Sequence, residues 1–287
     1  MGSRQLRQYY DPVTLVVADD LGPAVEPWLR HRRRLLASLE DLTDEQWRGG
    51  TRCVDWDVHG VISHLVNVDG FWVLSLSAAQ AGQAPTKYLT GFDPSSSTDG
   101  LVDAMRGLSP SELLEQFRTG TDALVAVVES FTPDDWRAVG ESPLGHIPAR
   151  FLLGHALWDS WLHERDIFEP LGMSPPVEAD ELFIATWFTL FFSGLQGGLL
   201  DDAAAVGPGP AVPIDVTLAF EELAEAALTL HIDSGIQLGR ANGAVPVPAG
   251  SAVNLVECMT GRRPLELLNP ALPADVVAQL ERAASVL

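Results

Sequence analysis

The stretch FLLGHALWDSWLHERDI, residues 151–167, constrains the fold of this chain most strongly. Its apolar residues recur at helical spacing, and a second stripe of the same helix carries His155, Asp159, His163 and Asp166. Because side chains four positions apart lie one turn above each other, Asp159 and His163 can present an oxygen and a nitrogen to one ion. His155 with Asp159 is the competing pair, since His155 and His163 are about 12 Å apart along the axis and cannot both join Asp159 at one compact site.

Three further segments have helical periodicity, at residues 23–39, 57–81 and 109–131. Ser109 and Glu112 form the sequence signature of a capping box at the start of the last of these. Together with the first stretch, they predict an antiparallel four-helix bundle over residues 22–172, after an N-terminal extension at 1–21.

Two connections in this bundle are expected to be loops. Residues 83–100, rich in Pro, Ser, Thr and Gly, read as a long loop of the kind that forms lids or substrate-binding walls. The connection around residues 136–148 is expected to be a second loop.

The sequence pattern changes after residue 176. An apolar helix at 180–196 leads to a Gly/Pro linker at 207–210, and alternating apolar residues then predict strands at 216–220, 228–232 and 236–238. Helices are expected at 251–260 and 273–286. Residues 177–287 therefore read as a smaller α+β domain, which gives a two-domain α + β chain of 287 residues.

A catalytic metal in a helix bundle typically has three nitrogen or oxygen ligands and one open position. His64 is the natural third ligand beside Asp159 and His163, because it lies in the body of the helix at 57–81 among apolar neighbours. A hydrogen-bonded core histidine and a solvated aspartate satisfy the same pattern, so spacing alone leaves both interpretations open.

Charge and composition exclude several classes of protein. The formal charge of −21 repels phosphate backbones, and the arginines at 30–34 read as a solvated helix face, so no nucleic acid is expected. The uncharged run at 182–200 contains Thr, Ser, Gln and Gly and reads as a buried core helix, so no membrane is expected. Without an apolar leader the chain is expected to be cytoplasmic, as a monomer or homodimer. The two cysteines, Cys53 and Cys258, predict no disulfide framework.

Other residues near the expected ligands have ordinary structural interpretations. Cys53 reads as structural, and Asp55, Asp57 and Asp69 as helix caps or solvated positions. The tryptophans read as bundle core, with pocket lining as the alternative; they are Trp56, Trp72, Trp158 and Trp161.

Several motifs resemble the DinB-like metalloenzymes grouped with mycothiol-dependent maleylpyruvate isomerase. They are Thr51-Arg52-Cys53, Trp56-Asp57-Val58 with Val61, Ile62 and His64, Gly145-His146-Ile147-Pro148-Ala149, Asp159-Ser160-Trp161-Leu162-His163, Asp166-Ile167 and Leu171-Gly172. The likeness covers about 150 residues. Residues 250–264 are similar, over a shorter stretch, to the sterol-carrier-like domain that such proteins often carry.

The resemblance implies a site and a chemistry. The positions that match the family's metal ligands are His64, Asp159 and His163. Zn²⁺ is the expected ion, and mycothiol is the expected thiol cosubstrate. His155, Asp166, Trp56 and Trp72 are then expected around the ligands. This chain departs from the family pattern with Asp159 in place of glutamate, Gly60 in place of an acidic residue and His59 in place of arginine.

The sequence is therefore compatible with three functions. The first is a metal-dependent enzyme that uses a low-molecular-weight thiol for isomerisation of, or sulfur transfer to, a small electrophilic substrate. The second is a thiol-independent metal-dependent hydrolase, lyase or cyclase. The third is a metal-free ligand- or partner-binding protein of the same fold.

Overall fold

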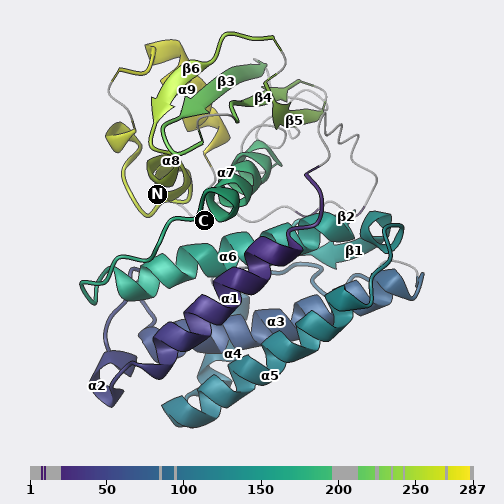
Figure 1. Cartoon of the computed structure of the whole chain (residues 1–287), viewed down its shortest axis with the longest axis vertical. Coiled ribbons are helices and arrows are strands. Elements are labelled where there is room, and N and C mark those ends of the chain that lie inside the picture. The colour runs from purple at the N-terminus through teal and green to yellow at the C-terminus, as the bar shows by residue number, and fades with distance from the viewer. Residues whose placement is uncertain are drawn as a thin grey trace. The chain divides into compact units, whose positions relative to one another are not determined.

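The computed structural model describes residues 8, 10, 21–83, 86–93, 96–195, 213–223, 226–233, 235–241, 243–268 and 271–284 (Figure 1). The chain divides into two compact units, Pro23–Val177 and Glu178–Leu287, the latter with Met1–Gly22. Apart from residues 8, 10 and 21, the predicted extension at 1–21 lies outside the described residues, as does the predicted linker at 207–210.

The first unit is a four-helix bundle, which confirms the predicted fold class. Its long helices are α1 (Val25–Glu40), α3 (Val58–Gln80), α5 (Pro110–Glu129) and α6 (Ala149–Phe168). Helix α3 packs against both α5 and α6, and α1 covers the other side of the same two helices (Figure 1). The short helix α2 (Asp44–Trp47) packs against α3. Apolar side chains from all of these helices form one continuous buried cluster, in which Leu35, Ile62 and Phe117 are almost fully inaccessible to solvent.

Local sequence signals fix where two of these helices begin. The Ser109 side chain accepts a hydrogen bond from the Glu112 N–H, and the Glu112 carboxylate accepts one from the Ser109 N–H, so the predicted capping box is confirmed. At the start of α3 the Asp57 carboxylate accepts a hydrogen bond from the Gly60 N–H. Asp57 is therefore a helix cap, one of the two roles expected for it.

The two connections predicted as loops contain regular structure. Helix α4 (Ser96–Met105) begins inside the segment expected to be a loop at 83–100, and it packs against α3. After the 3₁₀ turn Asp135–Arg137, strands β1 (Val139–Ser142) and β2 (Gly145–Pro148) form an antiparallel hairpin. The prediction of a loop is wrong for the second connection and, in the first, for the residues from Ser96 onward; the described residues of the first connection before Ser96 contain no helix or strand. Gly, Pro and Ser here serve a tight turn and a helix start, which local composition does not distinguish from loop.

The hairpin holds the neighbouring connection in place. Glu141 of β1 is fully buried, and its carboxylate accepts hydrogen bonds from the Thr86 hydroxyl at 2.7 Å and from the N–H groups of Tyr88 and Leu89 at 2.8 Å each. Gly140 brings the same strand against the bundle, where a Cβ atom would lie 2.6 Å from Leu152 Cδ1. The connection at residues 86–89 is thereby tied to α3 and α6 through β1.

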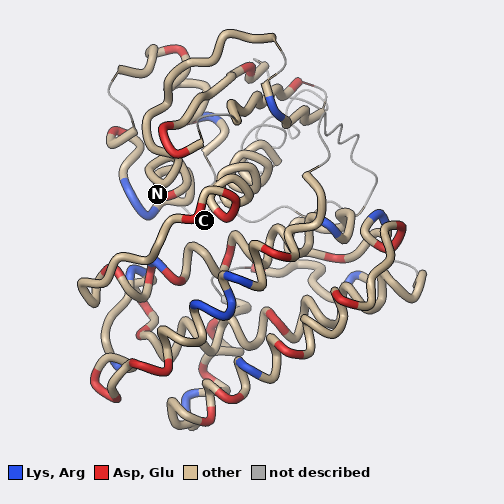
Figure 2. The backbone as a smooth tube through the Cα atoms, in the orientation of Figure 1, with Lys and Arg blue, Asp and Glu red and all other residues tan. Residues whose placement is uncertain are grey.

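The arginine cluster of α1, blue in Figure 2, is only in part the solvated face that was predicted: Arg30 and Arg33 are exposed, whereas Arg32 and Arg34 pair with carboxylates of other helices. Arg32 is 1% exposed and makes a bidentate pair with the buried carboxylate of Asp69 on α3, at 2.8 and 3.2 Å. Arg34 makes a second bidentate pair with Glu164 of α6, at 2.9 Å for each hydrogen bond. The expectation that Asp69 caps a helix or is solvated is therefore also wrong. The hydrophobic periodicity of one helix does not show whether a charged residue on it pairs with a residue on a neighbouring helix.

Helix α3 is long and apolar enough, by length and composition alone, to cross a membrane. It packs against α4, α5 and α6, and a core helix of this kind passes the same test.

The second unit is a small α+β assembly. Strands β3 (Ile214–Phe220), β4 (Leu228–Ile232), β5 (Ile236–Arg240) and β6 (Val247–Gly250) form one sheet in the order β5-β4-β3-β6. All neighbours are antiparallel except β3 and β6. Helix α7 (Ala179–Ser193) packs against β5 and α8 (Ala252–Met259), and α9 (Ala274–Ala283) packs against β3. The three predicted strands are present, β6 was not predicted, and the resemblance to a sterol-carrier-like domain stays a prediction.

Candidate metal centre

The three residues expected to bind a metal lie side by side in the bundle. His64 comes from the first third of α3, and Asp159 and His163 lie one turn apart on α6. One donor atom from each of the three lies within 4.8 Å of the other two. Because α3 and α6 pack directly against each other, residues 95 positions or more apart meet at one point.

The distances suit a shared ion. His64 Nε2 lies 3.4 Å from Asp159 Oδ2, and His163 Nε2 lies 3.6 Å from Asp159 Oδ1. Two nitrogen or oxygen ligands of a tetrahedral zinc ion, each about 2.0–2.2 Å from the metal, are about 3.3–3.6 Å apart. His64 Nε2 and Asp159 Oδ2 are buried, and apart from their ion-pair contact with each other they have no hydrogen-bond partner among the described residues. Buried polar atoms normally have partners, so the residues present fit a divalent ion.

The electrostatics of the three groups favour positive charge at this point. Burial raises the pKa of Asp159, but the adjacent His64 and His163 bring it below its usual range. Burial lowers the pKa of His163, but Cys53, Asp159 and Asp166 raise it to about 10. A divalent cation supplies the positive charge that a proton otherwise supplies, so metal and proton compete for His163.

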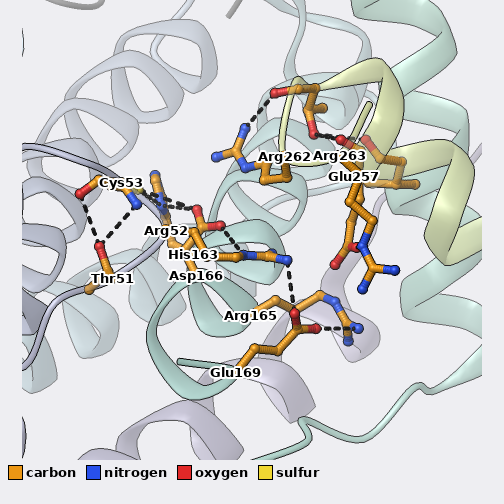
Figure 3. A network of polar contacts seen from close by, with 12 residues as sticks. Thr51, Arg52, Cys53, His163, Arg165, Asp166, Glu169, Glu257, Arg262 and Arg263 are labelled. Atoms are coloured by element: carbon orange, nitrogen blue, oxygen red, sulfur yellow. Dashed lines mark hydrogen bonds and ion pairs between the residues drawn. The ribbon is translucent and has the colours of Figure 1, made fainter. Parts of the chain in front are cut away.

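Asp166 holds the other nitrogen of the His163 ring. Its Oδ2 atom lies 3.1 Å from His163 Nδ1, and its Oδ1 atom accepts a hydrogen bond from Arg52 Nε at 3.0 Å (Figure 3). Arg52 also bonds Glu169 at 2.9 Å, which fixes the guanidinium at the end of α6. A carboxylate on the far nitrogen of a ligating histidine orients the ring and increases its basicity. Asp166 is in the position for that role.

Trp56 lies beside His64, with ring centroids 5.3 Å apart. Gly60 lies one turn before His64 on α3 and makes room for the Trp56 ring. A Cβ atom at position 60 would lie 3.0 Å from Trp56 Cβ and 3.3 Å from Trp56 Cγ. The glycine that departs from the family pattern thus gives the tryptophan access to the site. His59, the other departure on α3, lies 3.0 Å from the Leu108 carbonyl oxygen and contributes no atom to the cluster.

His155, the competing residue on α6, is 5% exposed and lies between two tryptophan rings. Its ring centroid is 5.0 Å from that of Trp72 and 5.5 Å from that of Trp158. Burial lowers the pKa of His155 to about 4, so the ring is neutral at physiological pH. Trp72 and Trp158 are themselves buried, as expected for bundle core.

Cys53 lies closer to the site than the sequence suggested. Its Sγ atom lies 3.4 Å from Asp166 Oδ2 and 3.6 Å from His163 Nδ1, and the residue is half-buried. The sequence signal was the Thr51-Arg52-Cys53 motif before α3, which marked family membership without indicating which helix the thiol faces. The structural role expected for Cys53 stays a prediction, since a hydrogen-bonded thiol at the edge of the core is compatible with it.

Fold and site together define a class of protein, a four-helix bundle with a His/Asp/His cluster between two of its helices. Residues 28–168 match the family of the mycothiol maleylpyruvate isomerase N-terminal domain. This domain of the chain belongs to that family, which confirms the resemblance noted in the motifs.

Two crystal structures show the same fold over a larger part of the chain. The crystal structure of a mycothiol-dependent maleylpyruvate isomerase aligns with a TM-score of 0.55 at 14% identity, covering 83% of this chain and 89% of its own. A histidine-to-alanine variant of such an isomerase gives a TM-score of 0.54 with the same identity and coverage. YfiT from Bacillus subtilis, titled a probable metal-dependent hydrolase, aligns at 0.41 with 18% identity, over 57% of this chain and 95% of its own. Comparison with curated proteins gives no match.

Proposed function

We propose that this protein is a metal-dependent enzyme that uses a low-molecular-weight thiol, mycothiol, to isomerise or transfer sulfur to a small electrophilic substrate. The observation that carries the proposal is the meeting of His64, Asp159 and His163 at ligand spacing in a domain of the mycothiol maleylpyruvate isomerase family. Two nitrogens and one carboxylate make a donor set that suits Zn²⁺ and leaves one position open.

The chemistry requires a thiolate at neutral pH. His64, Asp159 and His163 would hold a divalent ion, and such an ion, when bound, would lower the pKa of a thiol that ligates it. Isomerisation then needs no net change in the thiol. The thiolate adds to a carbon–carbon double bond conjugated to a carbonyl, and the electron pair of that double bond moves to the carbonyl oxygen. The new single bond rotates, and elimination restores the double bond in the other geometry and releases the thiolate.

The chain's own residues support this chemistry in three ways. Asp166 keeps the His163 ring oriented with Nε2 towards Asp159. The His163 and Asp159 side chains, 8% and 17% exposed, are largely buried, which limits the access of bulk water to the ligands. The Trp56 ring covers His64 on the side of α4, where its indole N–H donates to Asp99 at 3.2 Å.

The first test is the metal content of the purified protein and of two variants. We expect about one divalent ion per chain in the wild type and a loss in His64→Ala. His59→Ala is the matched control, because it removes an imidazole from the same helix that faces the Leu108 carbonyl instead. A wild type that neither contains nor is stabilised by Zn, Ni, Mn, Fe or Co would rule the proposal out.

The second test is turnover with and without thiol. Isomerisation of maleylpyruvate, or of another cis-enoyl acid, is expected only when mycothiol is present. Turnover of a substrate that is undiminished without thiol would instead support the thiol-independent hydrolase, lyase or cyclase. A protein that holds metal but turns over no electrophile with thiol would also contradict the proposed function.

A further inference from the structure

The His163 ring has donor atoms on both of its sides. Nε2 faces Asp159, whereas Nδ1 faces Cys53 and Asp166. Cys53, His163 and Asp166 form a second group of potential ligands (Figure 3). The second group differs from the first because it contains a sulfur atom, the donor that thiophilic cations prefer.

The spacing of the second group is close to that of ligands around a tetrahedral ion, with one of its three distances shorter. Cys53 Sγ lies 3.6 Å from His163 Nδ1 and 3.4 Å from Asp166 Oδ2, and His163 Nδ1 lies 3.1 Å from Asp166 Oδ2. Ligation to zinc through one sulfur at about 2.3 Å and through nitrogen and oxygen at about 2.0–2.2 Å places the donors about 3.3–3.6 Å apart. No donor needs to move by more than a few tenths of an ångström to reach this arrangement.

The three donor atoms already face one another. Arg52 bonds Asp166 through Oδ1 and leaves Oδ2 directed at Cys53 and His163. Cys53 is half-buried, so a small cation reaches its sulfur, while Asp166 is fully buried and His163 is 6% exposed. The thiol proton now donated to Asp166 Oδ2 is the proton that a metal ion would replace.

We infer that Cys53, His163 Nδ1 and Asp166 form a second metal site, which takes a thiophilic divalent cation such as Cd²⁺ or excess Zn²⁺ and excludes an ion from the His64/Asp159/His163 site. The exclusion follows from the imidazole, because a neutral ring has one lone pair and offers it at Nε2 or at Nδ1. An ion at Cys53 therefore leaves His64 and Asp159 without their third ligand.

Titration of the metal-free full-length protein with Cd²⁺ tests this inference. A thiolate bound to Cd²⁺ gives a charge-transfer absorption in the ultraviolet, and metal binding protects the thiol from alkylation. We expect the absorption and the protection of Cys53 in the wild type and in Cys258→Ser. Cys258 is the matched control, since it lies in the other unit with its Sγ near the Pro264 carbonyl oxygen. Cys53→Ser is expected to bind Cd²⁺ without the absorption.

Two histidine variants distinguish a second site from a fourth ligand of the first. His64→Ala is expected to keep the thiolate absorption, whereas His163→Ala is expected to lose it. Loss of the absorption in His64→Ala would overturn the inference, because Cys53 would then belong to a single shared site. So would a Cys53 that remains open to iodoacetamide at saturating Cd²⁺, a measurement on the wild type that does not depend on whether a variant folds. Because Cd²⁺ alone is the probe, the inference can fail or hold independently of turnover with thiol.

Discussion

His163 has a different neighbour at each ring nitrogen, and that asymmetry decides what the residue does. Asp159 Oδ1 lies 3.6 Å from Nε2, and Asp166 Oδ2 lies 3.1 Å from Nδ1. The carboxylate on Nδ1 favours the tautomer whose lone pair is at Nε2, where Asp159 and His64 lie. Asp166 therefore acts on the proposed metal through His163, as a positioning residue.

Replacing Asp166 with asparagine tests this role. We expect Asp166→Asn to weaken zinc affinity by about 10–100-fold, the usual cost of losing a carboxylate behind a ligating histidine. The measurement is competition with a chelator of known affinity. Glu169→Gln is the matched control, because Glu169 also pairs with Arg52 at the end of α6 and has no contact with His163 among the ion pairs of the described residues. Equal losses in the two variants would assign the effect to Arg52 instead.

Among single residues, those whose role is visible along one helix were predictable. Asp159 and His163 are four positions apart, and spacing alone identified them as one of two possible pairs. The family motif chose between the two pairs and agreed on His64, which its place in the neighbouring helix had already made the candidate for the third residue. The contacts of Cys53 and Arg32 were not predicted, because their partners, Asp166 and Asp69, lie on other elements. Whether two side chains on different elements pair depends on how the elements pack. The sequence pattern of either element alone does not show how they pack.

At the scale of elements, the helices were predictable and their connections were not. Period 3.6 over 15 or more residues marked α1, α3, α5 and α6, and side-chain caps marked the starts of α3 and α5. The β1–β2 hairpin has only four residues in each strand, too short for an alternating pattern. Its place is set by the bundle, through Ser75 of α3, whose hydroxyl donates to the Glu141 carbonyl oxygen at 2.7 Å.

The contact between this hairpin and the bundle depends on Gly140. A Cβ atom there would lie 2.6 Å from Leu152 Cδ1 and 2.9 Å from Ser75 Oγ, closer than packed atoms approach. We expect Gly140→Ala to lower the free energy of unfolding by about 1–3 kcal/mol, the usual cost of overpacking. Gly70→Ala is the control, because no atom lies within 4 Å of its added Cβ and the change favours the helix by up to about 1 kcal/mol. Urea denaturation compares them; unchanged stability in Gly140→Ala would mean that the hairpin moves freely away from α3 and α6.

The contact between α1 and α6 contains a buried carboxylate with two basic partners. Burial raises the pKa of Glu164, but His31 at 3.3 Å and Arg34 at 2.9 Å bring it down to about 2. The folded-state pKa is thus below the unfolded value of 4.5, so this stabilisation is complete above pH 4.5 and is lost as the pH falls towards 2.

Glu164→Gln should therefore be less stable than the wild type near pH 7, by roughly 3 kcal/mol, with the difference shrinking as the pH falls from 4.5 towards 2. Urea denaturation across that range measures the difference. Glu40→Gln is the control, since its pair with Arg118 also joins two helices but is 35–52% exposed and is expected to contribute below about 1 kcal/mol. A Glu164→Gln difference that stays constant with pH would contradict the assignment.

At the scale of the whole molecule, the proposed metal site belongs to one unit. His64, Asp159 and His163 all lie in Pro23–Val177, together with Asp166 and the apolar cluster that holds α3 against its neighbours. No ligand in the described part of the chain comes from Glu178 onward. The capacity to bind a metal is therefore expected to be a property of the bundle by itself.

A chain limited to residues 23–177 tests this expectation. We expect it to fold as a helical unit and to bind one Zn²⁺ per chain, because the cluster of the core and the three ligands are all retained. Far-ultraviolet circular dichroism reports the helices, cooperative thermal unfolding reports packing, and metal analysis reports the ion. The same shortened chain with His64→Ala should fold equally well without the ion. If the shortened chain unfolds cooperatively yet binds no metal, then residues outside the bundle complete the site, and the three-ligand assignment is wrong.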